Sequence, residues 1–170
     1  MKIIVLSLLL FTSISFSQSL EKNEVDEFTG EKVKATEWMG LAYTLDGDMR
    51  YRLCMVDTVA AINIKMILSY HDIYSVSKGD ELLIKLSTNE VLKGKSIKSV
   101  FSCKGCGAVD LMGSNAYGLN TMYYIDKKTL QKLKTTPIAK IRIYTSAGTV
   151  ERELKPKRAE KFIKSVNLLN

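Results

Sequence analysis

The body of the chain alternates apolar and polar residues, a two-residue period that is typical of half-buried β-strands. In 60–68, Asn63 and Lys65 interleave the apolar series, which favours a strand over the alternative of a buried helix. Turn-forming segments such as Lys-Gly-Asp at 78–80 separate the alternating stretches. The pattern predicts strands in seven segments: 32–38, 50–56, 60–68, 81–86, 91–92, 97–101 and 138–144.

A hairpin loop is expected at 145–148, because its closing glycine supplies the positive φ that such a connection needs. The register set by this loop pairs Arg142 with Glu151 and Lys140 with Glu153. A shift of one residue would instead oppose two arginines, which is unfavourable. The charge pattern therefore supports one strand register.

Two helices are predicted in the last third of the chain. Asp126 is placed to cap a short helix over 127–134, and Pro156 suits the first turn of a closing helix. Apolar residues of that closing segment recur at helical spacing, at Ala159, Phe162, Ile163 and Val166. Many strands followed by a terminal amphipathic helix predict an α+β domain with a mostly antiparallel sheet, sandwich- or barrel-like.

The first seventeen residues have the pattern of a cleavable signal peptide. Lys2 precedes an apolar run, and Ser15-Phe16-Ser17 puts small residues before an expected cleavage ahead of Gln18. Even extended to Phe16, the apolar segment has about 14 residues, against roughly 20 for a membrane span. We therefore expect a signal peptide at 1–17, a loose polar leader at 18–30 and a single α+β domain at 31–170.

The expected product is periplasmic or secreted, soluble, and without a stable membrane anchor. A lipoprotein would carry a cysteine at the cleavage site, whereas the first cysteine of this chain is Cys54. The predicted mature chain carries 24 Lys and Arg against 18 Asp and Glu, a net charge of +6. Residues 18–60 hold nine acids and five bases, whereas 127–170 hold twelve bases and three acids.

This uneven charge suits an anionic partner. Outside the cytoplasm we expect an envelope protein, a lipid headgroup or an anionic polysaccharide rather than nucleic acid. A solvated basic surface without a partner is the simpler interpretation of the same composition.

The most distinctive local sequence is Cys103-Lys104-Gly105-Cys106. Redox catalysis is disfavoured because glycines follow this pair where a dithiol oxidoreductase has a helix. A structural metal site built from Cys54, His71, Cys103 and Cys106 is an alternative, although the spacing matches no known zinc module. A disulfide is favoured, either between Cys103 and Cys106 or between Cys54 and one of them.

Catalytic motifs are not apparent, so the chain is expected to be a non-enzyme without a cofactor. His71 is the only histidine, and no nucleophile motif accompanies it. The glycine-rich segment 102–120 is long for a connection between strands, and long ordered loops often carry function. The candidate binding residues within it are Asp110, Asn115 and Tyr117. The alternative is that the segment is a flexible insertion held by a disulfide and has no binding role.

Several short motifs carry a resemblance to a known group. They are Asp-Glu-Phe-Thr-Gly at 26–30, Lys-Gly-Asp at 78–80, and the strand at 138–144 followed by a hairpin and a terminal helix. In this order the chain resembles small exported proteins of unknown function found in Bacteroidota. The resemblance implies export and a β-rich fold, and it implies no activity.

The function expected from the sequence is therefore that of an exported, non-catalytic domain that binds an envelope or extracellular component. A structural metal or a thiol/disulfide site at Cys103 and Cys106 is the alternative.

Overall fold

A computed structural model describes residues 19–44, 47–67, 73–109 and 114–169. These residues form thirteen strands and two helices. In chain order the elements are β1 (Leu20–Val25), β2 (Lys32–Thr36), β3 (Met39–Thr44), β4 (Gly47–Val56), β5 (Val59–Ile67), β6 (Ser75–Val76), β7 (Glu81–Leu86), β8 (Val91–Ser96), β9 (Val100–Phe101), β10 (Cys103–Lys104), β11 (Tyr117–Ile125), α1 (Lys127–Leu133), β12 (Ile138–Thr145), β13 (Gly148–Glu153) and α2 (Pro156–Asn167).

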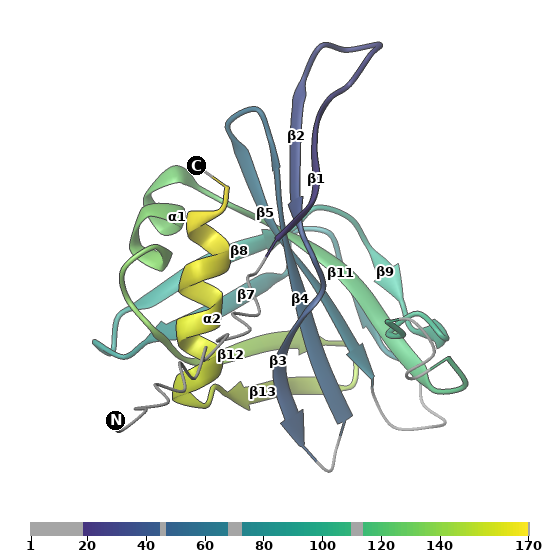
Figure 1. The fold of residues 1–170 in the computed structure, drawn as a ribbon. Helices are drawn as coiled ribbons and strands as arrows, with labels where there is room; N and C mark the ends of the chain where they lie inside the picture. Colours follow the sequence, from purple (N-terminus) through teal and green to yellow (C-terminus); the bar gives the residue numbers. More distant parts are fainter. Residues whose placement is uncertain (1–18, 45–46, 68–72, 110–113, 170) are drawn as a thin grey trace, which may run out of the picture.

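One large antiparallel sheet organises the fold. Its strands follow the order β1-β2-β4-β5-β11-β8-β7-β12-β13, with β3 also paired to β4 and β10 to β11. The half that contains β7, β8, β12 and β13 crosses behind the half that contains β4, β5 and β11 (Figure 1). The two halves enclose one core, so the expected α+β class with a mostly antiparallel, sandwich-like sheet is confirmed.

The long strands β4 and β5 form the centre of the front half. Their alternation places Tyr51 and Leu53 in the core opposite Ile64 and Ile62, and all four side chains are buried. Asn63 and Lys65 point to the other face, as the two-residue period predicts. The strand predicted over 60–68 is confirmed for 60–67; β5 begins one residue earlier, at Val59, and Leu68 lies outside the described residues.

Helix α2 packs across the side of the fold between β3 and β12. Phe162 is buried against Tyr51, with ring centroids 4.7 Å apart. The Tyr51 hydroxyl and Ser165 Oγ form a buried hydrogen bond of 2.9 Å. The amphipathic pattern of the closing helix therefore identified its buried face correctly.

Burial raises the pKa of Tyr51 to about 12, despite the hydrogen bond to Ser165. In the unfolded chain this tyrosine ionises near pH 10. Buried Tyr51 therefore contributes its full stabilisation below pH 10, and this contribution is lost as the pH rises toward 12. We predict that Tyr51 alone lowers the free energy of unfolding by about 2–3 kcal/mol over this window, and that Tyr123, whose pKa is also raised by burial, adds to the decline. Urea titrations at several pH values will show a smaller decline for Tyr51→Phe; equal declines would contradict this assignment.

The predictions for the last third of the chain are confirmed. Asp126 caps α1 by accepting a hydrogen bond from the Thr129 amide at 2.6 Å. This bond to the backbone is the main cause of the lowered pKa of the Asp126 carboxyl. The hairpin register pairs Arg142 with Glu151 and Lys140 with Glu153, as the charges required.

The expected loose leader is wrong for the described residues from 20 onward. Residues 20–25 form β1, which pairs with β2 from Leu20↔Thr36 to Val25↔Lys32. Its residues are polar because β1 is the edge of the sheet and most of its side chains face solvent. Backbone pairing with β2, rather than apolar burial, orders this segment.

The segment 102–120 also differs from the expected single long loop. It contains β10 and the start of β11, and Tyr117 and Gly118 pair with Lys104 and Cys103. A Cβ on Gly118 would lie 2.6 Å from the Gly107 Cα, so the two chain segments meet at a pair of glycines. Gly107 and Gly118 therefore allow two chain segments to pack closely together, whereas the many glycines of this segment had suggested a flexible loop.

Candidate functional site

A pocket of about 320 Å³ opens between β2, the β4–β5 turn, α1 and Leu169, two residues after the end of α2. Its volume is at the lower end of the range for small-molecule sites. The lining comprises Lys32, Lys34, Met55, Asp57, Thr58, Lys127, Leu130, Gln131, Lys134 and Leu169. We refer to it as the lysine pocket.

The pocket has an apolar component that comes from three elements. Leu130 from α1 and Leu169, after α2, are buried, and Met55 from β4 is half-buried. Leu130 and Leu169 belong to the main core cluster, and Met55 packs against it. The pocket therefore ends on a surface that the fold already holds in place.

Four lysines contribute the charge, two from β2 and two from α1 and its C-cap. Lys32 and Lys34 share a strand face because they are two residues apart. Lys127 opens α1, and Lys134 caps its C-terminal end. Residues separated by about a hundred positions in the chain thus meet around one cavity.

Hydrogen bonds fix the walls of the lysine pocket. Lys34 Nζ donates to the Leu169 carbonyl at 3.2 Å, which ties β2 to the end of α2. Asn167 Nδ2 donates to the Lys134 carbonyl at 3.2 Å, which ties α2 to the end of α1. The pocket is therefore largely formed before any ligand binds.

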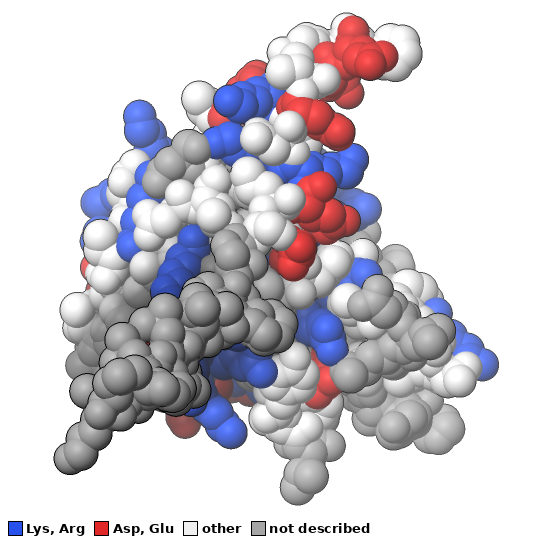
Figure 2. Space-filling model, viewed as in Figure 1, with Lys and Arg blue, Asp and Glu red and all other residues white. Residues whose placement is uncertain are grey.

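Among the described residues that line the pocket, Asp57 is the single acid. It lies in the turn between β4 and β5 with a φ of 50°, and its Oδ1 accepts a hydrogen bond of 2.9 Å from the Lys32 amide. The described lining thus carries four lysines and one aspartate, and this excess of positive charge favours an anion. Figure 2 shows lysine and arginine side chains over the neighbourhood of α1, whereas acidic side chains gather on the β1–β2 hairpin.

Of the residues expected to bind a ligand, the two that the structure describes, Asn115 and Tyr117, do not line this pocket. Asp110 lies outside the described residues. Asn115 is exposed, and Tyr117 is half-buried at the first position of β11. Their role in binding stays a prediction, and the structure brings neither Asn115 nor Tyr117 to the lysines.

Cys103 and Cys106 lie at disulfide distance, with Cα atoms 5.2 Å apart, whereas Cys54 is free and half-buried on β4. The sequence left several cysteine pairings open, and the structure matches the pairing of Cys103 with Cys106. Burial is the main cause of the raised pKa of the Cys54 thiol. His71 lies outside the described residues, and within them no group of three or more Cys, His, Asp or Glu side chains is placed to hold a metal.

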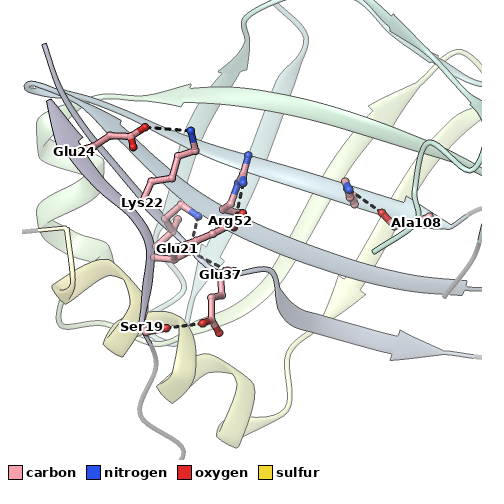
Figure 3. A network of polar contacts seen from close by, with 10 residues as sticks. Ser19, Glu21, Lys22, Glu24, Glu37, Arg52 and Ala108 are labelled. Atoms are coloured by element: carbon pink, nitrogen blue, oxygen red, sulfur yellow. Dashed lines mark hydrogen bonds and ion pairs between the residues drawn. The ribbon is translucent and has the colours of Figure 1, made fainter. Parts of the chain in front are cut away.

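A second polar cluster lies on the outer face of β4 and β5, around Trp38. The Arg52 guanidinium and the Lys65 ammonium lie 5.0 Å and 4.6 Å from the Trp38 ring centroid. Arg52 also pairs with Glu21 at 3.2 Å, and Lys65 donates to the Ala108 carbonyl at 2.7 Å (Figure 3). These contacts join β1 and the 108 region to the central strands, so we assign the cluster a structural role.

No family model, no curated protein and no solved structure matches the chain. Within the described ranges, no helix has the length and apolar character needed to cross a membrane.

The sequence carried only a weak signal for the lysine pocket. The alternation at 32–36 puts Lys32 and Lys34 on one face, the Asp126 cap marks the start of α1, and the helical period identifies the buried face of α2. Their convergence depends on the pairing of β2 with β4 and on the packing of both helices. These long-range contacts are not encoded in any local motif.

Proposed function

We propose that this chain is an exported, non-catalytic domain that binds a small amphipathic anion in the lysine pocket. One observation supports it above the others: four lysines surround a pocket whose inner wall is apolar. A carboxylate or phosphate with a short hydrocarbon part would pair with the lysines and cover Met55, Leu130 and Leu169. A free fatty acid has this chemistry, and so does a lipid headgroup together with the first carbons of its acyl chain.

The composition of the lining favours this ligand class over the other expected anionic partners. The pocket lining contains no aromatic side chain on which a sugar ring or a base would stack. Its volume of about 320 Å³ suits a single small molecule. Among the described residues, the lining contains no histidine or cysteine. Its Asp57 carboxylate accepts a hydrogen bond from a backbone amide, and both features support binding without catalysis.

Calorimetric titration with three probes separates the two parts of the recognition. We expect octanoate to bind about tenfold more tightly than octanol, which lacks the charge, or inorganic phosphate, which lacks the tail. Lys127→Gln combined with Lys134→Gln is expected to weaken octanoate binding by about tenfold, because two charge-assisted contacts are lost. Octanol binding should not change.

The matched control combines Lys98→Gln with Lys104→Gln. These exposed lysines line no described pocket, and their replacement removes the same total charge. Octanoate affinity should be unchanged. Equal losses in the two double variants, or equal binding of octanoate and octanol, would contradict the proposal.

Export is the second part of the proposal and rests on the 1–17 segment and on the cysteine pair. When the full chain is produced in a Gram-negative host, the recovered protein should have the mass of a chain that begins at Gln18. Thiol titration in denaturant should find one thiol before reduction and three after it. A chain that retains Met1 and three reduced thiols would contradict export.

A further inference from the structure

The β1–β2 hairpin projects from the body of the molecule (Figure 1). Phe28 lies in the turn that joins its two strands. This side chain is 99% exposed. Burial of an aromatic ring is strongly favourable in water, so a fixed and fully exposed phenylalanine suits contact with another surface. A further side chain of the hairpin, Val25, is 60% exposed.

The tip has a defined conformation. Asp26 Oδ1 accepts hydrogen bonds from the amides of Phe28 at 2.9 Å and Thr29 at 2.8 Å. The Gly30 amide donates to the Asp26 carbonyl at 2.8 Å, and Gly30 takes a φ of 72°. Phe28 is therefore presented without the ordering cost of a flexible loop.

Acidic residues flank Phe28 at the tip of the hairpin: Asp26, Glu27 and Glu31. Glu24, farther along β1, pairs with Lys22 at 3.2 Å and is not counted among them. Figure 2 shows this concentration of acidic side chains at the projecting end. A complementary surface must combine an apolar recess with several cations. The lysine pocket has both features.

Phe28 does not occupy the pocket of its own chain, because it is almost completely exposed. Phe28 lies in the turn at one end of the hairpin, and Lys32 and Lys34 of β2 line the pocket farther along it. Two hairpins placed antiparallel can therefore put each tip at the pocket of the other chain. The arrangement is closed and two-fold symmetric, so it ends at a dimer.

We propose that the chain forms a symmetric dimer in which Phe28 of each copy enters the lysine pocket of the other and the acidic hairpin pairs with the pocket lysines. The dimer uses the same pocket as the proposed anion. Self-association and octanoate binding are therefore competitive. The dimer itself requires only the complementarity of hairpin and pocket, whether or not an anion is a natural ligand.

Sedimentation velocity over a range of concentrations tests self-association. We expect a monomer–dimer equilibrium that weakens with added salt. Phe28→Ala should weaken dimerisation by about tenfold or more, as for the loss of a central aromatic anchor. The matched control is Phe101→Ala, which removes another exposed phenylalanine, 69% exposed, and should leave the equilibrium unchanged. A wild-type chain that is monomeric throughout, or equal effects of both variants, overturns the dimer.

Photocrosslinking locates the contact. Phe28→p-benzoylphenylalanine should form intermolecular crosslinks to peptides that contain 127–134 or Leu169. Intermolecular crosslinks elsewhere, or none, overturn the proposed geometry. Octanoate titration of Phe28→Ala tests the anion site separately. If the lysine pocket is the anion site, the variant binds octanoate at least as tightly as the wild type. If the variant and the wild type both fail to bind octanoate, the proposed function is wrong, and the sedimentation and crosslinking results still decide the dimer.

Discussion

Replacement of Phe162 by alanine will lower the free energy of unfolding by about 3–5 kcal/mol, the range for the loss of a buried phenylalanine. Phe162 is 2% exposed and packs on Tyr51 between α2 and the central sheet. Its removal leaves a cavity beside the buried hydrogen bond between Tyr51 and Ser165. Because α2 covers one side of the core, the loss of its packing destabilises the whole domain.

Urea denaturation of the wild type and Phe162→Ala measures this effect. Phe101→Ala is the control, because Phe101 is 69% exposed and its truncation should change stability by less than about 0.5 kcal/mol. A change below about 1 kcal/mol for Phe162→Ala would mean that α2 does not pack on the sheet as described.

Gly107→Ala is expected to destabilise the chain by about 3 kcal/mol, at the upper end for overpacking. An added Cβ would overlap the Met66 carbonyl and press on the Ile67 amide, which are backbone atoms of a central strand and do not yield easily. Gly107 also packs against Gly118 at the pairing of β5 with β11. The substitution would therefore separate the 103–109 segment from the sheet.

Thermal and urea denaturation of Gly107→Ala measure this loss. Gly79→Asn is the control, because no atom lies within 4 Å of a Cβ at that position and asparagine tolerates positive φ better than other side chains. It should cost less than about 1 kcal/mol. Equal stability losses in the two variants would show that Gly107 is not confined by β5.

The sequence predicted the elements whose signals are local. The alternation of 60–67, the Asp126 cap and the opposite charges across the β12–β13 hairpin each depend on neighbouring residues, and the structure contains all three. The cysteine pair at 103 and 106 was likewise one of the predicted disulfides.

The predictions failed where distant contacts decide the structure. The polar residues of β1 are ordered by pairing with β2, and the glycines near 107 and 118 allow two segments to touch. The lysine pocket depends on a strand and two helices that meet only in the folded chain. A pattern confined to one segment does not contain this information.

The central claim is that the lysine pocket binds an amphipathic anion, and a nuclear magnetic resonance titration with octanoate tests it directly. The account predicts saturable shifts of the Met55 methyl group and of the Lys127, Leu130 and Leu169 amides, with little change at the Met122 methyl on β11. Shifts centred on Asn115 and Tyr117, or no saturable shift, would contradict it.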